Sequence, residues 1–286
     1  MIYLDHAATT PVPAEVAKAV YDTLTAGWGN PSSQYPFGAQ AKARVDAARE
    51  TLAAALGCKA GEFIFTSCGS ESDNWALRLA AHQNRRVGKH IITTAVEHSA
   101  ILETCKALEQ EGCSVTYLKP DKSGGITASQ VEDALREDTA LVTMMLVNNE
   151  TGCIFPVGEV AQLLQAKGSR ALLHTDAVQA FLKLPFRADA LGADLISVSG
   201  HKLGAPKGIG GLYLGPRVRA PQPLIYGGGQ ERGLRSGTEA TGQIAGFARA
   251  VALRADHLDD TLARMAAVKA YAEEKLTAKL RELVIL

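Results

Sequence analysis

The chain has 286 residues, 47% of them hydrophobic, so it can bury a full core as one large domain or two smaller ones. Its 30 basic and 30 acidic side chains cancel, which argues against nucleic acid or an anionic membrane as a partner. The start lacks a basic stretch followed by an apolar run, and no later apolar segment is long enough to span a bilayer. We therefore expect a cytoplasmic protein.

The cysteines argue against a disulfide framework and against a zinc site. They are odd in number, lie far apart and include no C-x-x-C pair. His174 and Asp176 stand two residues apart, but no third ligand converges on them, so we expect no metal. Reduced thiols are the expected state of Cys58, Cys68, Cys105, Cys113 and Cys153.

The first elements in chain order are helices. Val16, Val20 and Leu24 fall at helical spacing, and a second helix is predicted over 39–56, where Gly57 stops it. From Glu62 onward, short apolar runs alternate with helical stretches. Strands are predicted at 63–65, 91–94, 115–118, 141–147, 171–174 and 195–198. Helices are predicted between them at 70–86, 99–111, 128–136 and 157–167.

This alternation predicts an α/β fold in which helices sandwich a mostly parallel sheet. Past Gly233 the pattern becomes helical, with an apolar stripe from Leu258 to Leu283 that we expect to be partly exposed. The last four residues, 283–286, read as the start of a strand. Ligands in such folds bind at the carboxyl ends of the strands, so the polar residues that follow each predicted strand are the candidate site.

Lys202 follows a predicted buried strand and precedes a Gly/Pro-rich loop over 203–211. An amine at an apolar sheet edge has a lowered pKa and can form a Schiff base with a carbonyl cofactor such as pyridoxal phosphate (PLP). PLP also needs an acid that keeps its pyridine nitrogen protonated, and Asp176 is placed for that. A surface lysine and a helix N-cap at Asp176 remain alternatives.

Small residues over 66–70 join a strand to a helix, where backbone N–H groups could hold the cofactor phosphate, with Gly69 and Ser70 as contacts. The alternative is a capping box between Ser70 and Asp73. His98 could stack on the cofactor ring or transfer protons, although a single histidine is more often structural.

Taken together, these segments resemble the cysteine desulfurases of the class V aminotransferase superfamily, which are fold-type I PLP enzymes. The resemblance covers nearly the whole chain. It rests on Tyr3-Leu-Asp-His-Ala-Ala-Thr-Thr-Pro11, Gly29-Asn-Pro-Ser-Ser33, Thr66-Ser-Cys-Gly-Ser-Glu71, Glu97-His-Ser99, Asn148-Asn-Glu-Thr-Gly152, Asp176-Ala-Val-Gln179, Ser199-Gly-His-Lys202 and Arg235-Ser-Gly-Thr238.

The resemblance implies a role for each matched residue. Lys202 would bind PLP covalently, Asp176 would pair with the pyridine nitrogen, and Gln179 would contact the ring hydroxyl. His98 would stack on the ring and move protons. Asn149 would lie against the ring and Asn30 near the substrate. The phosphate contacts would be Gly69, Ser70, Ser199, His201 and, from the second subunit of a homodimer, Thr238.

The resemblance also implies a reaction. L-Cysteine would give L-alanine and a protein-bound persulfide, passed to a sulfur acceptor for iron–sulfur cluster assembly or tRNA thiolation. The family's nucleophilic cysteine and its substrate-binding arginine belong to a small C-terminal domain. We expect a large PLP domain over 1–250 and an incomplete small domain over 251–286, with weak or absent sulfide release. Packing is the favoured role of Cys68 and Cys153.

Other functions stay open at this point. A selenocysteine lyase or a small-amino-acid transaminase would share these motifs, and a truncated homologue could serve as a non-catalytic dimerising scaffold. A dinucleotide-binding protein is excluded, because the glycines at 208–211 and 227–229 form no G-x-G-x-x-G after a first strand.

Overall fold

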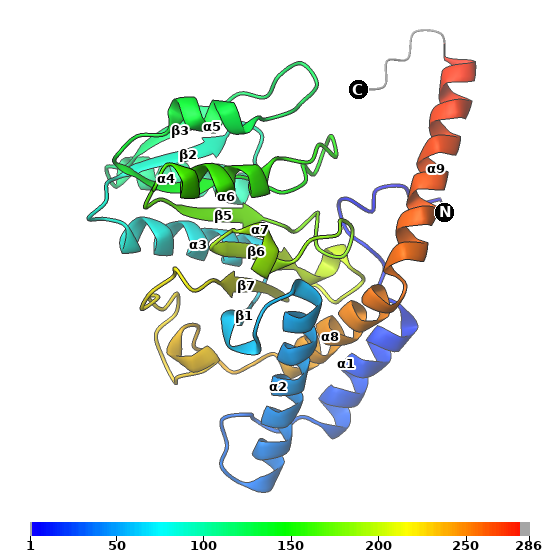
Figure 1. Ribbon diagram of the computed structural model, residues 1–286. Coiled ribbons are helices and arrows are strands. Elements are labelled where there is room, and N and C mark those ends of the chain that lie inside the picture. Colours follow the sequence, from blue (N-terminus) through cyan, green and yellow to red (C-terminus); the bar gives the residue numbers. More distant parts are fainter. Residues whose placement is uncertain (1, 281–286) are drawn as a thin grey trace.

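A single sheet organises the molecule in this computed structural model, which describes residues 2–280 (Figure 1). Within that range seven strands follow the order β1-β7-β6-β5-β4-β2-β3. They are β1 Phe63–Thr66, β2 His90–Thr94, β3 Ser114–Leu118, β4 Thr139–Thr143, β5 Leu172–Asp176, β6 Leu195–Ser199 and β7 Gly210–Leu214. The run β3-β2-β4-β5-β6 is parallel, and β7 is antiparallel to both β6 and β1. The predicted mostly parallel sheet is confirmed.

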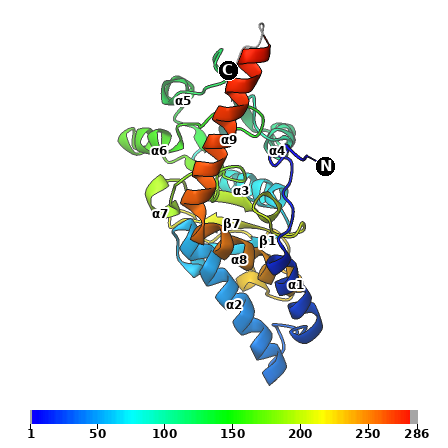
Figure 2. The same cartoon turned by 90° about the vertical axis from the view of Figure 1, so that its right-hand side faces the viewer.

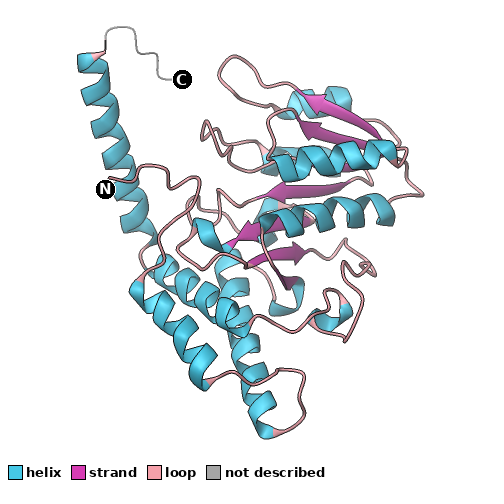
Figure 3. Cartoon of the chain, turned by 180° about the vertical axis from the view of Figure 1, so that it is seen from behind, coloured by secondary structure: helices cyan, strands magenta, loops and turns pink. Residues whose placement is uncertain are grey.

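Helices cover both faces of the sheet (Figure 3). They are α1 Ala14–Ala26, α2 Pro36–Leu56, α3 Gly69–Gln83, α4 Ser99–Gln110, α5 Ala128–Ala134, α6 Val157–Ala166, α7 Ala188–Leu191, α8 Thr241–Asp256 and α9 Leu258–Lys279. Successive strand residues point to opposite faces, so Ile91 packs in the core under α3 and α4, whereas Ile92 packs in the core under α2, α5, α6 and α8. Each face is therefore a separate apolar layer.

Most predicted elements end within about three residues of the observed bounds. Gly57 ends α2 with a left-handed φ of 78°. The strand predicted over 141–147 is shorter, because β4 ends at Thr143. Met144 and Leu146 still donate backbone hydrogen bonds to the carbonyl oxygens of His174 and Asp176 in β5, and Met145 and Val147 line a pocket described below.

Strand β7 is the main element that the sequence reading missed, because its glycines read as a loop. The reason for glycine is close packing. A Cβ on Gly211 would lie 2.1 Å from the Phe63 ring, and one on Gly210 would lie 2.7 Å from the backbone of Cys68. Both glycines let β7 fit between β1 and β6 without steric overlap.

The last two helices differ in how they pack. Helix α8 lies against α1 and α2 and buries Ile244, Phe247 and Val251, whereas no residue of α9 is buried and its Met265 is 49% exposed. Figure 1 shows α9 standing apart from the sheet, and in Figure 2 the same helix faces the viewer and runs in front of the sheet. The expected exposure of the apolar stripe is thus seen as far as residue 280. The predicted domain boundary after residue 250 falls within α8, and the predicted strand at 283–286 lies outside the described residues.

None of the helices described between residues 2 and 280 combines the length and the apolar character needed to cross a bilayer.

Candidate active site

A pocket of about 440 Å³ opens at the carboxyl ends of the parallel strands. It brings together every predicted site residue except Asn30 and Thr238. Its lining consists of Asp5, Ala7, Ala8, Cys68, Gly69, Ser70, Asp73, His98, Met145, Val147, Asn149, Glu150, Asp176, Val178, Gln179, Ser199, His201 and Lys202. The volume is typical of small-ligand sites.

Lys202 lies at one side of this pocket, on the short 3-10 turn η2 (Gly200–Lys202) that follows β6. Its Nζ donates hydrogen bonds to the carbonyl oxygens of Ala7 and, at 2.9 Å, of Ala8. Burial lowers the pKa of the Lys202 amine, and the negative charge of Asp176 partly opposes this effect. The amine is therefore held inside the site and is easier to deprotonate than a surface lysine.

Asp176 ends β5 and is almost fully buried. Its Oδ1 accepts a 2.8 Å hydrogen bond from the Val178 N–H in a turn, so the alternative that it caps a helix is wrong. Burial raises the pKa of Asp176, while this N–H and the positive charge of Lys202 lower it. A cationic group placed beside Asp176 would stabilise its charged form.

The N-terminus of α3 forms another side of the pocket. The residue that precedes the helix is Cys68, with no side-chain cap, so the alternative capping box between Ser70 and Asp73 is not formed. The first N–H groups of a helix have no carbonyl partner within it. A Cβ on Gly69 would lie 2.9 Å from Val178 Cγ2 and 3.4 Å from Ser199 Cβ, so glycine leaves a small hollow between the first turn of α3 and the Ser199 side chain.

His98 stands exposed at the N-cap of α4 and lines the pocket. Its Nδ1 accepts a 3.1 Å hydrogen bond from the Ala100 N–H, so in the neutral ring the proton is on Nε2. On the opposite side, His201 Nδ1 lies 3.2 Å from Thr9 Oγ1, which ties the lysine turn to the N-terminal segment. Both imidazoles are thus fixed in orientation.

Two amide side chains complete the lining. Lys183 Nζ donates to Gln179 Oε1 at 2.9 Å, and Gln179 Nε2 donates to the Ala7 carbonyl at 2.9 Å. This fixes the amide so that its donor side faces the N-terminal segment. Asn149 is held beside the pocket by a turn in which Asn148 Oδ1 accepts from the N–H of Glu150 at 3.0 Å.

A group of buried polar side chains next to the pocket was not predicted from the sequence. It consists of Thr143, His174, Ser197 and Asp73. His174 is fully buried, and its ring nitrogens lie 2.8 Å from Thr143 Oγ1 and 3.0 Å from Ser197 Oγ. Asp73 Oδ1 lies 3.7 Å from His174 Nε2. Burial lowers the pKa of His174 to about 3 and raises that of Asp73 well above its ordinary value. His174 is therefore neutral at physiological pH, and burial disfavours the charged form of Asp73.

Glu97 is a second buried acid near the site. Its Oε1 accepts from Thr94 Oγ1 at 2.8 Å and from the Met145 N–H at 3.0 Å, while its Oε2 has no hydrogen-bond partner among residues 2–280. Burial raises the pKa of Glu97 from 4.5 to about 8. Glu97 therefore ionises at a lower pH in the unfolded chain than in the folded chain. The stability contributed by the neutral acid is complete below pH 4.5 and is lost as the pH rises through about 8.

We expect Glu97→Gln, which mimics the protonated acid, to stabilise the fold by roughly 1–3 kcal/mol at about pH 8 and much less at about pH 5. Urea unfolding at the two pH values measures this difference. Glu103→Gln, at an exposed acid on the same segment of chain, is the control and should show no such dependence. An equal effect of Glu97→Gln at both pH values would contradict the neutral state.

Asn30 and Thr238 do not line the pocket of this chain. Asn30 is exposed, and its Oδ1 accepts a 2.9 Å hydrogen bond from the Ser32 N–H within its own loop. Thr238 is also exposed and follows Gly237, whose N–H donates to Gln230 Oε1 at 3.0 Å. Their predicted roles remain predictions.

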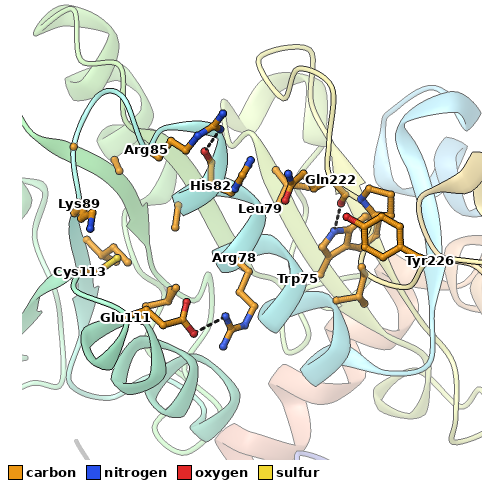
Figure 4. Close-up of a pocket in the computed structure, with 17 residues that line it drawn as sticks. Trp75, Arg78, Leu79, His82, Arg85, Lys89, Glu111, Cys113, Gln222 and Tyr226 are labelled. Atoms are coloured by element: carbon orange, nitrogen blue, oxygen red, sulfur yellow. Dashed lines mark hydrogen bonds and ion pairs between the residues drawn. The ribbon is translucent and has the colours of Figure 1, made fainter.

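Another cavity, of about 430 Å³, lies along the second half of α3 and contains none of the predicted residues. Figure 4 shows its side chains, among them Arg78, which donates to Glu111 Oε1 at 2.9 Å. Both of these charges are about half exposed, so the pair contributes little to stability. The cavity carries no arrangement of groups comparable to Lys202 and Asp176.

The fold and the site define a class. A lysine after one central strand, a buried acid at the end of the next and a helix N-terminus beside them are the features of a fold-type I PLP enzyme. The chain belongs to the aminotransferase class-V family, whose model matches residues 2–285. Membership of this family implies dependence on PLP.

Several of its relatives within the family are cysteine desulfurases. The chain is 45% identical over 273 residues to the cysteine desulfurase IscS of Glaesserella parasuis, covering 94% of this chain and 66% of that protein. It is 44% identical over 282 residues to a cysteine desulfurase of Trichormus azollae, covering 98% and 69%. The chain thus spans about two thirds of the length of these relatives.

Solved structures agree with this assignment. A NifS-like protein superimposes with a TM-score of 0.93 at 38% identity, covering 97% of this chain and 76% of the other. A structure of SspA in complex with cysteine superimposes with a TM-score of 0.84 at 40% identity, covering 88% and 72%. The resemblance noted from the motifs is confirmed, and so is the fold class.

Proposed function

We propose that this chain binds PLP in the pocket at the carboxyl edge of the sheet and acts in the removal of sulfur from L-cysteine. The observation that carries the proposal is the meeting of the Lys202 amine and the Asp176 carboxylate in one pocket beside the N-terminus of α3. The names of the relatives and the cysteine bound to SspA support L-cysteine as the substrate.

The residues present fit this cofactor. The hollow left by Gly69 and the free N–H groups of α3 suit a phosphate, with Ser70, Ser199 and His201 at its edge. Asp176 suits a protonated ring nitrogen, because such a cation offsets the cost of burying the carboxylate. Gln179 offers an N–H donor to a ring hydroxyl, and Asn149 lies in the pocket wall.

When bound, PLP supplies an electron sink for bond cleavage next to an amino group. Lys202 would attach the cofactor, and its amine, which donates to the carbonyl oxygens of Ala7 and Ala8, could accept and return a proton in the pocket. His98 covers the pocket and can donate the proton on its Nε2. Its fixed ring orientation keeps that proton directed away from its own helix.

The complete reaction transfers one sulfur atom. The carbon–sulfur bond of L-cysteine breaks, the sulfur joins a protein thiol as a persulfide, and a proton takes its place on the carbon to give L-alanine. Cys68 lines the pocket, but it precedes α3 in a fixed extended conformation and is poorly suited to move toward a substrate sulfur. We propose that a sulfur-acceptor protein then receives the sulfur, and that Asn30 lies near the substrate.

We further propose a homodimer in which Thr238 of one subunit contacts the phosphate bound by the other. Its exposed position outside the pocket of its own chain is compatible with this role. A division into a large PLP domain over 1–250 and the beginning of a small domain over 251–286 also remains part of the proposal.

The test is a titration of the purified chain with PLP, followed by visible absorbance before and after addition of L-cysteine, with alanine and sulfide measured as products. We expect a bound-cofactor band that shifts with L-cysteine and not with D-cysteine. Sulfide release is expected to be weak, because Cys68 is the one cysteine among the residues that line the pocket and it precedes α3 in an extended conformation. Burial also raises the pKa of the Cys58, Cys105 and Cys113 thiols, and Cys153 Sγ donates to the Ser123 carbonyl oxygen. Absence of any bound-cofactor band would contradict the proposal.

A further inference from the structure

The segment from Ile225 to Ala240, here called the 225–240 segment, has almost no regular structure of its own. It contains one isolated bridge, between Ile225 and Arg235, and the short 3-10 turn η3 (Glu231–Gly233). It carries Thr238 at its exposed end. A segment with so few backbone ties needs other contacts to hold one conformation.

One such contact is a buried ion pair. Arg49 on α2 donates two hydrogen bonds of 2.7 Å to the carboxylate of Glu231, whose side chain is 3% exposed. Glu231 Oε2 also accepts from the Phe65 N–H at 2.9 Å. A bidentate arginine–carboxylate pair fixes both position and orientation, so Glu231 anchors the segment to the sheet edge.

The backbone at this anchor is strained. Glu231 and Arg232 adopt left-handed φ values of 48° and 60°, which L-residues other than glycine seldom adopt. Gly233 continues the same conformation at 79°. The ion pair at Glu231 therefore stabilises a tight turn of the chain. After this turn the chain runs back toward α3, which Arg235 contacts.

The second contact joins this segment to the phosphate end of α3. Arg235 Nε donates to Glu71 Oε1 at 2.8 Å and Arg235 Nη2 donates to Glu71 Oε2 at 3.2 Å, with side chains 22% and 16% exposed. Glu71 follows Ser70 directly and also accepts a short hydrogen bond from Ser67 Oγ. The Glu71 carboxylate thus contacts both Ser67, which precedes Gly69, and Arg235, which lies three residues before Thr238.

We propose that Glu71 and Arg235 are positioning residues that set the place of Thr238 relative to the phosphate site, so that each subunit presents Thr238 correctly to its neighbour. This inference rests on the proposed function, in particular on the contact of Thr238 with the phosphate in the other subunit. The pair acts through Thr238 and touches no cofactor itself. Its removal therefore matters only while the Thr238 hydroxyl is present.

The experiment is a double-mutant cycle read out as PLP affinity, measured by titrating the cofactor-free chain and following visible absorbance. Glu71→Gln is expected to weaken PLP binding about 10-fold, since it removes a half-buried charged contact. Thr238→Val should weaken binding by a similar factor. In the double variant, Glu71→Gln should weaken PLP binding by less than about 2-fold beyond Thr238→Val alone, because the effects of residues that act through one contact are not additive.

Two further variants test how specific this effect is. Arg235→Gln should reproduce the loss seen with Glu71→Gln, and combining the two should add nothing. Arg78→Gln, on the same helix but paired with exposed Glu111, is the matched control and should bind PLP as the unaltered chain does. Circular dichroism melting identifies any variant whose loss reflects unfolding, in which case the Arg235→Gln arm decides the outcome.

The results separate this inference from the proposed function. If Glu71→Gln weakens binding equally with and without the Thr238 hydroxyl, the pair does not act through Thr238 and the inference is wrong. If Thr238→Val binds PLP normally, the inference is wrong while PLP binding stands. If the unaltered chain binds no PLP, the proposed function itself is wrong.

Discussion

Replacing Lys202 by alanine is expected to abolish covalent attachment of PLP and to slow the absorbance change of the bound cofactor on addition of L-cysteine on the order of 10⁴-fold or more. The amine is half-buried, its pKa is lowered by burial, and it lies in the same pocket as Asp176. Treatment with PLP and borohydride, followed by peptide mass spectrometry, should find the reduced adduct on Lys202 in the unaltered chain and on no lysine in the variant.

Two lysines close to Lys202 serve as controls. Lys207 is exposed on the loop that follows it, so Lys207→Ala should keep the adduct. Lys183 is a largely buried amine whose pKa is lowered to about 8, but it donates to Gln179. An adduct on Lys183 in the unaltered chain would show that a low pKa alone selects the amine, and would overturn the assignment to Lys202.

The site could be predicted from the sequence because its residues lie at or near the ends of strands, and strands have a recognisable sequence pattern. Asp176 is the last residue of a buried strand, Lys202 and His98 come shortly after other buried strands, and parallel strands bring their carboxyl ends to one edge of a sheet. Their positions at the carboxyl ends of parallel strands are therefore enough to bring these side chains together. Their separate roles came from the resemblance to a family.

Contacts between distant parts of the chain could not be predicted in this way. Glu231 finds Arg49 at a separation of 182 residues and Arg235 finds Glu71 at 164, in a segment without a period of two or 3.6 residues. Strand β7 could not be predicted for a related reason. Glycine is needed at position 211 because the Phe63 ring packs against it, and no local sequence pattern shows this contact.

Replacing Asp176 by asparagine is expected to leave PLP attached through Lys202 and to slow the reaction with L-cysteine by about 10²- to 10³-fold, the cost of losing one preorganised electrostatic contact. Asparagine keeps the shape of the side chain and its acceptor for the Val178 N–H, but it cannot hold a proton on the ring nitrogen by opposite charge. Stopped-flow absorbance after mixing with L-cysteine measures the rate.

The stability of the same variant separates this cause from misfolding. Because burial raises the pKa of Asp176 above 3.8, the charged form disfavours the cofactor-free fold, and this penalty grows as the pH rises through the folded-state pKa. Asp176→Asn should therefore melt no lower than the unaltered protein near neutral pH without PLP, while reacting far more slowly with it. Asp189→Asn, at an exposed aspartate paired with Arg187, should leave the reaction rate unchanged. A variant that both melts earlier and loses PLP would instead show that Asp176 is needed for the fold.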